Sequence, residues 1–243
     1  MQKAEGQGWS LFCGDYREVL ADVTFNAGIC DPPYGKRTHD GNDDVPNREA
    51  DLRSYSCWTP DDVYAFVRFM SERCDGWLAS MTSDDLITPY RDAYSDCKRM
   101  DFAPVPILQH RPRMGGDGPG SGTCYLMVSR PRERRFMSWG SLPCWYESSP
   151  DKTGIVNGAK PLALMRSIVR DYSRPGDLVV DATAGGATTL LAAVMEGRRA
   201  IGSEVNAQTH AKAFARLSKP FQAGLFVGTP TPATQIDLLQ YPA

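Results

Sequence analysis

Apolar positions recur with a helical spacing in the last third of the chain. Leu164, Met165, Ile168 and Val169 fall on one face of a helix, so the pattern predicts a helix over Lys160–Tyr172. Shorter apolar runs, separated by glycine and polar residues, continue this alternation of helix and strand. The further elements predicted here are a strand over Leu178–Val180, a helix over Thr188–Glu196, a strand over Arg199–Ser203 and a helix over Ala207–Leu217.

Apolar runs of strand length also mark the earlier part of the chain. Thr59-Pro60-Asp61-Asp62 predicts a helix start, because it combines a capping hydroxyl, a first-turn proline and acids at the positive end of the dipole. The polar stretch from Gly35 to Trp58 has no period and is predicted to be a long surface loop. The elements predicted are strands over Trp9–Cys13, Ala27–Asp31, Trp77–Met81, Pro104–Gln109 and Thr123–Ser129, and helices from Pro60 to about Cys74 and from Ser83 onward.

The order of these elements predicts an α/β fold. A strand that leads through a glycine turn into a helix and then a second strand is a βαβ unit with parallel strands, and Leu178–Ser203 has this order. No internal repeat and no long linker divides the chain, so we predict a single doubly wound domain over residues 1–243. The span at about 109–150, between the two halves, is predicted to be a small insertion.

Composition narrows the class of protein. Hydrophobic residues make up 42% and charged residues 23% of the chain, as in a soluble globular protein, and no apolar run has the length of a membrane span. The seven cysteines form no C-x-x-C pair, which argues against a disulfide framework and a metal site and favours a reducing, cytoplasmic location. Because the net charge is −2, any surface for nucleic acid has to be a local patch.

The first candidate site is a turn of small residues, Asp181 to Ala187, followed by Glu204 at the end of the next strand. Small residues let a ligand approach backbone N–H groups at a helix N-terminus, and an acid ending the second strand can accept both ribose hydroxyls of an adenosine. Dinucleotide sites and S-adenosylmethionine sites share this pairing, although the G-x-G-x-x-G pattern is absent because Ala187 stands two residues after Gly185. A tightly packed α/β turn without a ligand is the structural alternative.

The second candidate site is Asp31-Pro32-Pro33-Tyr34, at the end of a strand. The exocyclic amino nitrogen of adenine or cytosine is a poor nucleophile, and two acceptors, the Asp31 carboxylate and the Pro32 carbonyl, can aim its lone pair at a methyl sulfonium. The prolines fix the backbone and remove competing N–H donors, and Tyr34 offers a ring face to a base that has left the helix stack. The alternative is a rigid strand-to-loop exit, since Asp-Pro and Pro-Pro are common in loops.

Together these residues resemble the amino-methylating DNA methyltransferases of the permuted β type, in which the catalytic D-P-P-Y precedes the cofactor loop. The matching order is Gly14-Asp15, Asp31-Pro32-Pro33-Tyr34, a variable segment, Lys160-Pro161, the turn from Asp181, and Glu204. The resemblance implies a Rossmann-like fold with a seven-stranded, mostly parallel sheet, and S-adenosyl-L-methionine as the cofactor. It implies catalytic roles for Asp31, Pro32, Pro33 and Tyr34, and cofactor contacts from Asp15, Lys160, Pro161, Asp181, Thr183, Ala184, Gly185, Gly186 and Glu204.

The roles implied within the cofactor site are distinct. Asp15 would contact the adenine and Glu204 the ribose, whereas the Asp181–Gly186 turn would contact the methionine part. Lys160 and Pro161 would open the helix that covers the methionine end. The chain departs from the family pattern Asp-Pro-Phe-x-Gly-x-Gly at Ala182, Thr183 and Ala187. Two of these departures, at Thr183 and Ala187, put the cofactor affinity in question.

Basic residues between the two halves are predicted to contact DNA, because arginine suits phosphates and guanine edges. The alternative for the Arg130–Arg135 cluster is a solvated turn. The residues predicted to bind DNA are Lys36, Arg37 and His39, directly after Tyr34, and Arg111, Arg113, Arg130, Arg132, Arg134 and Arg135, within the recognition insertion.

The resemblance therefore predicts a DNA methyltransferase that acts on N6 of adenine in a flipped base. N4 of cytosine is the alternative within the same chemistry, although such enzymes more often carry Ser-Pro-Pro-Tyr. A cofactor- and DNA-binding subunit with little or no activity is the alternative from another class. DNA is the predicted partner, no membrane or metal is expected, and a homodimer is left open.

Overall fold

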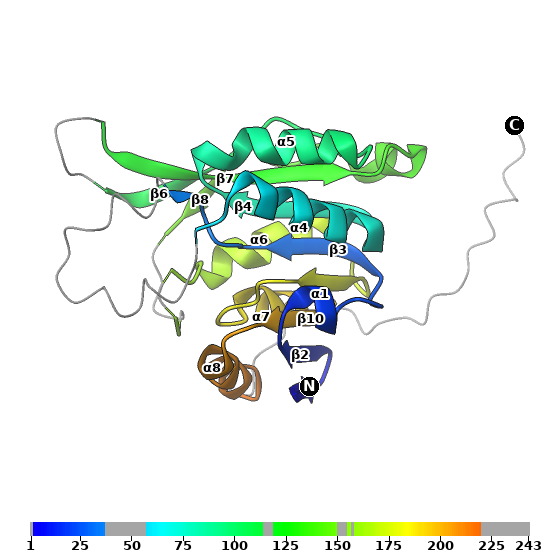
Figure 1. Cartoon of the computed structure of the whole chain (residues 1–243), viewed down its shortest axis with the longest axis vertical. Coiled ribbons are helices and arrows are strands. Elements are labelled where there is room, and N and C mark those ends of the chain that lie inside the picture. The colour runs from blue at the N-terminus through cyan, green and yellow to red at the C-terminus, as the bar shows by residue number, and fades with distance from the viewer. Residues whose placement is uncertain (1, 37–56, 114–118, 150–154, 157, 220–243) are drawn as a thin grey trace, which may run out of the picture.

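The structure, a computed structural model, describes residues 2–36, 57–113, 119–149, 155–156 and 158–219. They form a mixed sheet with helices on both faces (Figure 1). The strands are β1 Gln2–Gly6, β2 Trp9–Cys13, β3 Phe25–Cys30, β4 Cys74–Thr82, β5 Met100–Asp101, β6 Val105–Arg113, β7 Ser121–Arg130, β8 Tyr146–Ser148, β9 Leu178–Asp181 and β10 Arg199–Glu204. The helices are α1 Tyr16–Val19, α4 Pro60–Arg73, α5 Ile87–Asp96, α6 Leu162–Tyr172, α7 Thr188–Met195 and α8 Ala207–Leu217, with 3₁₀ turns η1 Asp84–Leu86 and η2 Arg134–Trp139.

The strand order in the sheet is β1-β2-β10-β9-β3-β4-β7-β6-β8, with β5 paired to β7. Strands β2, β10, β9, β3 and β4 are parallel, whereas β1 and β7 run antiparallel to their neighbours. The parallel strands all end at one edge of the sheet, which we call the carboxyl edge, and begin at the opposite, amino edge. The C-terminal unit β9-α7-β10 lies between β2 and β3, so segments far apart in sequence meet at the carboxyl edge.

Most predicted elements are confirmed, with bounds that differ by a few residues. Helix α4 begins after Thr59, whose hydroxyl accepts from the Asp62 N–H in a capping box, so the local start signal was sufficient. The predicted seven-stranded sheet is too small, because the described residues form a ten-stranded sheet. Strand β1 was missed because Gln2–Gly6 has no alternating apolar pattern, although it pairs with β2 across a turn at Gly8.

The span predicted as an insertion, 109–150, contributes the end of β6 and all of β7 and β8 to the sheet. Strand β7 lies between β4 and β6, and β8 pairs with β6. The C-terminal part of β6 and the first residues of β7 extend beyond Thr82, the last residue of β4, because Tyr125 is already level with Thr82. This hairpin therefore projects past the carboxyl edge, while the rest of the span is built into the domain.

Two apolar clusters, one on each face of the sheet, hold the helices in place. On one face α6, α7 and α8 contribute buried residues such as Ile168, Leu190 and Ala213. On the other face α4 and α5 contribute Phe66 and Tyr90, both essentially inaccessible to solvent. Because β3 and β9 are covered on both faces, their residues are apolar apart from Asn26 and Asp181. The loops that follow them have fixed positions at the carboxyl edge.

Candidate active site at the carboxyl edge

The Asp31–Tyr34 loop leaves the central strand β3 directly after Cys30, which is fully buried. The Tyr34 hydroxyl donates a hydrogen bond to Asp31 Oδ1 at 3.1 Å, and the Asp31 side chain remains 25% exposed. The Pro32 carbonyl accepts no hydrogen bond from the described residues. The loop thus presents a carboxylate and a carbonyl, the two acceptors that the amino-group chemistry requires.

Lys160, predicted to contact the cofactor, forms an ion pair with the carboxylate of this loop. Its Nζ lies 2.8 Å from Asp31 Oδ1 and 2.6 Å from Oδ2, and the side chain is 17% exposed. The same ammonium lies 4.9 Å from the centroid of the Tyr34 ring. Pro161 is the N-cap residue of α6, so the two residues open that helix as predicted. The structure therefore places Lys160 beside Asp31 and Tyr34, and its contact with the cofactor stays a prediction.

The base of the loop is held by residues that sequence reasoning did not select. Gly35 N–H donates to Ser83 Oγ at 3.1 Å, and Ser83 Oγ donates to Asp85 Oδ1 at 2.5 Å. A Cβ on Gly35 would lie 2.1 Å from Asp85 Oδ2, so any other residue here would require the Asp85 side chain to shift. The position of Ser83 directly after a strand could have indicated this contact. Because β4 and β3 are parallel neighbours, the residues that follow them lie at the same edge of the sheet.

Burial controls the protonation of the groups around Asp31. Burial raises the pKa of Tyr34 well above its usual value, and the nearby Asp31 carboxylate raises it further, so the hydroxyl stays a neutral donor. Cys124 on β7 is buried beside Tyr34, and burial raises its pKa while the Lys160 ammonium opposes that effect. The thiol is thus a further neutral neighbour of Tyr34.

The turn after β9 contains a second buried carboxylate. Asp181 is 2% exposed and accepts hydrogen bonds from the N–H and hydroxyl of Thr183 at 3.0 and 3.4 Å. Burial raises the pKa of Asp181 to about 6, and the charge of Asp31 also raises it, against hydrogen bonds from Thr189 and Thr183. Gly185 has a φ of +50° and Ala187 a φ of 59°, so the turn needs left-handed backbone at both positions. The predicted turn is therefore real and sits directly beside Asp31.

Glu204, at the end of β10, is the third carboxylate at this edge. It is 5% exposed, and its Oε1 accepts from the Asn206 N–H at 2.7 Å, while the Gly185 N–H also donates to it. Burial raises the pKa of Glu204. No lysine or arginine within the described ranges forms an ion pair with it. A buried acceptor without a cation fits the vicinal hydroxyls of an adenosine ribose.

Asp15 follows β2 and lies at the same edge, since Gly14 N–H donates to the Glu204 carbonyl at 3.0 Å. Its carboxylate is engaged within the chain, because Arg17 donates to it from Nε at 2.9 Å and from its backbone N–H at 2.8 Å. Asp15 is thereby the N-cap of α1. An adenine contact by Asp15 stays a prediction, and such a contact would have to share the carboxylate with Arg17.

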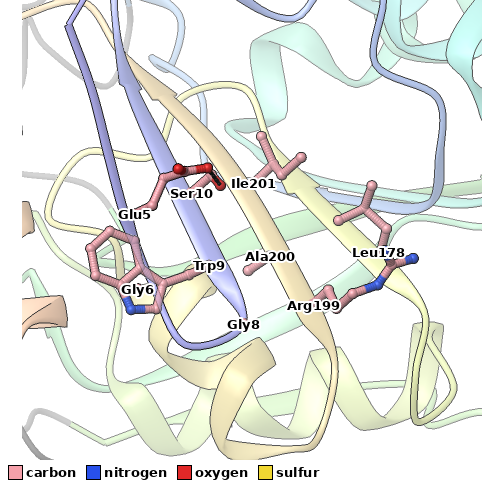
Figure 2. A pocket seen from close by; sticks show the side chains of 9 residues that line it. All are labelled: Glu5, Gly6, Gly8, Trp9, Ser10, Leu178, Arg199, Ala200 and Ile201. Carbon is pink, nitrogen blue, oxygen red and sulfur yellow. Dashed lines mark hydrogen bonds between the residues drawn. The ribbon is translucent and has the colours of Figure 1, made fainter.

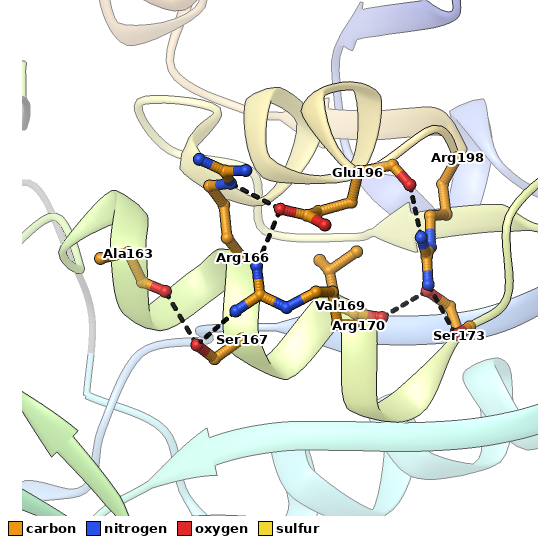
Figure 3. A network of polar contacts seen from close by, with 8 residues as sticks. All are labelled: Ala163, Arg166, Ser167, Val169, Arg170, Ser173, Glu196 and Arg198. Atoms are coloured by element: carbon orange, nitrogen blue, oxygen red, sulfur yellow. Dashed lines mark hydrogen bonds and ion pairs between the residues drawn. The ribbon is translucent and has the colours of Figure 1, made fainter. Parts of the chain in front are cut away.

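An ion-pair network sets α6 relative to α7 (Figure 3). Glu196, just after α7, accepts from Arg166 Nε at 2.6 Å and Arg170 Nη1 at 3.0 Å, both on α6. Arg198 Nε donates to Ser173 Oγ at 2.9 Å on the same side. The network therefore joins the C-terminal end of α7 to α6, away from the glycine turn at which α7 begins.

The residues predicted to bind DNA separate into three groups. Lys36 is exposed beside the Asp31–Tyr34 loop, whereas Arg37 and His39 lie outside the described residues. Arg111 and Arg113 lie on the part of β6 that projects past the carboxyl edge, and their side chains lie outside the described set.

The third group, Arg130, Arg132, Arg134 and Arg135, lies at the amino edge, because β7 runs antiparallel to β4. Arg135 reaches the carbonyl of Asp75, six residues before Met81 on β4, which places it about 20 Å from the level of Asp31. Arg132 donates to the carbonyls of Lys98 and Arg99. This group therefore does not line the site, so its position gives no support to the predicted contact with DNA, which nothing else tests.

A shallow cleft lies near the starts of β2, β10 and β9, also away from the carboxyl edge (Figure 2). It is lined by Glu5, Gly6, Gly8, Trp9, Ser10, Leu178, Arg199, Ala200 and Ile201. Within the described ranges no group of three or more His, Cys, Asp or Glu is placed to hold a metal ion. No described helix is both long and apolar enough to cross a membrane.

Comparisons with known proteins agree with this geometry. Residues 127–215 match a protein family described as DNA methylase. Over 63 residues the chain is 40% identical to the DNA adenine methyltransferase YhdJ of Escherichia coli strain K12, a stretch covering 26% of this chain and 19% of that protein. The chain thus spans about a fifth of the length of this curated relative.

Solved structures show the same fold over most of the chain. The complex of M1.HpyAVI with S-adenosylmethionine has a TM-score of 0.67 at 18% identity, covering 87% of this chain and 100% of that one. The PvuII cytosine-N4-specific DNA methyltransferase has a TM-score of 0.68 at 15% identity, covering 90% of each chain.

The shared fold defines the class, an α/β methyltransferase fold with a mostly parallel sheet. Within that class the DNA methylase match and the adenine-methyltransferase relative identify the chain as similar to the DNA amino-methyltransferases, which include N6-adenine and N4-cytosine types.

Proposed function

We propose that this protein transfers a methyl group from S-adenosyl-L-methionine to the exocyclic amino group of a flipped DNA base, N6 of adenine in the first place. The observation that carries the proposal is the position of Asp31. This carboxylate lies at the end of a central strand, held by Tyr34 and Lys160, directly beside the glycine turn. The DNA methylase match and the adenine-methyltransferase relative support the same reaction.

The residues at the ends of β9 and β10 fit the proposed cofactor. Glu204 would accept hydrogen bonds from the ribose hydroxyls, since its carboxylate is buried and has no cation partner in the described part of the chain. Gly186 lies against the side chains of Ile155 and Val156. A Cβ on Gly186 would lie 3.0 Å from Ile155 Cγ1, so these two side chains pack closely on the turn at this position. When bound, the cofactor supplies an electrophilic methyl group on a positively charged sulfur.

Asp31 and the Pro32 carbonyl would each accept a hydrogen bond from the amino group of the target base. The bond to Asp31 strengthens as positive charge develops on the amino nitrogen, so it stabilises the transition state more than the ground state. Asp31 Oδ can then take the proton that this nitrogen releases. Tyr34 OH and Lys160 Nζ hold the carboxylate in place meanwhile.

Lys160 lies beside both side chains that are proposed to contact the base. Its ammonium contacts both oxygens of Asp31, and because each carboxylate oxygen has two lone pairs, Oδ2 can also accept a hydrogen bond from an amino group. The ammonium also lies over the ring of Tyr34, the residue proposed to stack against the base.

N4 of cytosine is the second candidate target, and the similarity to the PvuII cytosine-N4-specific enzyme favours it. Asp31, where a serine would be typical of cytosine enzymes, favours adenine. DNA is the proposed partner, and the proposed location of the activity is the cytoplasm.

Transfer of a labelled methyl group from S-adenosyl-L-methionine to mixed duplex DNA tests the proposal. We expect incorporation by the wild type and a loss of roughly a hundredfold or more for Asp31→Ala, the scale of one preorganised polar contact. The variant should still bind cofactor and DNA. An Asp31→Ala enzyme with normal turnover would refute the assignment of Asp31, and a wild type that binds both ligands without transfer would support an inactive binding subunit.

A further inference from the structure

Ala187 occupies a backbone conformation that L-residues rarely adopt. It is fully buried at the start of α7, with φ 59° and ψ 34°, and no side chain caps the helix at this position. Glycine takes this left-handed conformation freely, whereas a Cβ strains it. The surrounding structure therefore has to impose the conformation on Ala187.

Arg216 supplies contacts on both sides of this residue. Its Nη1 donates to the Gly186 carbonyl and to the Thr188 hydroxyl, each at 2.8 Å. Arg216 lies on α8, 9% exposed, and is brought to the turn by packing rather than by sequence proximity. Because the Gly186 carbonyl belongs to the peptide that leads into Ala187, holding this carbonyl restricts the φ of Ala187.

The contact reaches the proposed cofactor site through the turn itself. Gly185 N–H donates to the Glu204 carboxylate, and Ala184 N–H donates to the Ser203 carbonyl at 2.8 Å. A rotation of the peptide between Gly186 and Ala187 would therefore change the direction of the N–H groups at the start of α7. It would also move the Gly185 N–H, which donates to Glu204. Bonds from a charged donor are stronger than neutral ones, so a guanidinium suits this task.

We propose that Arg216 is a positioning residue for the cofactor turn, holding Ala187 left-handed so that the turn and Glu204 keep their binding geometry. This inference rests on the proposed function, because it assigns the turn to S-adenosyl-L-methionine. Arg216 is needed because residue 187 is alanine, which adopts the left-handed conformation only under strain. With glycine at position 187 the turn would keep its conformation without Arg216.

The test compares Arg216→Met, which keeps the length but removes the donors, with Arg216→Met combined with Ala187→Gly. Arg198→Met is the matched control, since Arg198 is 8% exposed and binds Ser173 near the far end of α6. We expect Arg216→Met to weaken S-adenosyl-L-methionine binding in calorimetry about tenfold, the scale of one lost charge-assisted hydrogen bond. Turnover at saturating cofactor should change much less. Adding Ala187→Gly should restore most of the affinity, and Arg198→Met should leave it unchanged.

Hydrogen exchange of the cofactor-free protein gives a readout that does not depend on the reaction. Amides of residues 184–190 should exchange faster in Arg216→Met, return toward wild type with Ala187→Gly, and stay protected in Arg198→Met. Equal effects of the two arginine variants, or no rescue by glycine, would overturn the inference. A wild type that binds no S-adenosyl-L-methionine would instead refute the proposed function, while the exchange data would still decide the role of Arg216.

Discussion

Replacing Asp181 by asparagine should make the stability of the protein less dependent on pH. Asparagine keeps an acceptor for the Thr183 N–H but cannot ionise. In the wild type, burial and the nearby Asp31 raise the pKa of Asp181 from 3.8 to about 6. The folded protein therefore keeps this proton over a range in which the unfolded chain has lost it.

The sign and size of the effect follow from this difference. Stability falls with rising pH wherever the folded state binds more protons, here between about pH 4 and pH 6. A difference of about two pKa units corresponds to about 3 kcal/mol over the whole transition. Between pH 5 and pH 8, where the wild type and Asp181→Asn can be compared, Asp181 lowers the free energy of unfolding by about 1.4 kcal/mol.

Urea unfolding of the wild type and Asp181→Asn at pH 5 and pH 8 measures this quantity. All other titrating groups are common to both proteins, so they cancel in the difference. Between pH 5 and pH 8 the free energy of unfolding of the wild type should fall by about 1.4 kcal/mol more than that of the variant. Parallel changes in the two proteins would show that Asp181 titrates near its usual pKa, and the buried, Asp31-coupled position assigned to it would be wrong.

Three further predictions concern the site and its surroundings. Glu204→Ala should weaken S-adenosyl-L-methionine binding at least about tenfold, or 1.4 kcal/mol, and unchanged affinity in calorimetry would remove Glu204 from the cofactor site. Tyr34→Phe should lower turnover modestly because the hydroxyl that orients Asp31 is lost, whereas Tyr34→Ala should also weaken binding of an extruded fluorescent adenine analogue, by about 1–3 kcal/mol. Joint replacement of Arg132, Arg134 and Arg135 by alanine should leave the slope of log DNA affinity against log salt unchanged, since these residues lie at the amino edge; a flatter slope would place DNA there.

Local signals in the sequence were sufficient for most of the fold. The start of α4 was predicted because its capping box lies within four consecutive residues, Thr59 to Asp62. The Asp31–Tyr34 loop was predicted because its chemistry is contained in one tetrapeptide. Glu204 was predicted from a turn and a strand end within one βαβ unit, and the parallel pairing of β9 and β10 bears out that unit.

Contacts between distant segments were outside the reach of this reasoning. Lys160 pairs with Asp31 across 129 residues, and Arg216 reaches the turn across 30 residues, so no local pattern marks either contact. The direction of β7 was likewise marked by no local pattern, and it determines where the arginines that follow this strand lie. Placing Arg130 and the arginines after it away from the site required knowing that β7 runs antiparallel to β4 and carries these residues to the amino edge.

The central claim is that the exocyclic amino group of a DNA base receives the methyl group. Digesting DNA methylated by the wild type to nucleosides, and identifying the modified nucleoside by mass spectrometry, tests this claim most directly, with Asp31→Ala as the matched control. We predict N6-methyl-2′-deoxyadenosine from the wild type and none from the variant; N4-methyl-2′-deoxycytidine would keep the chemistry and change the target. A methyl group on a ring carbon, or no methylated nucleoside at all, would contradict the account.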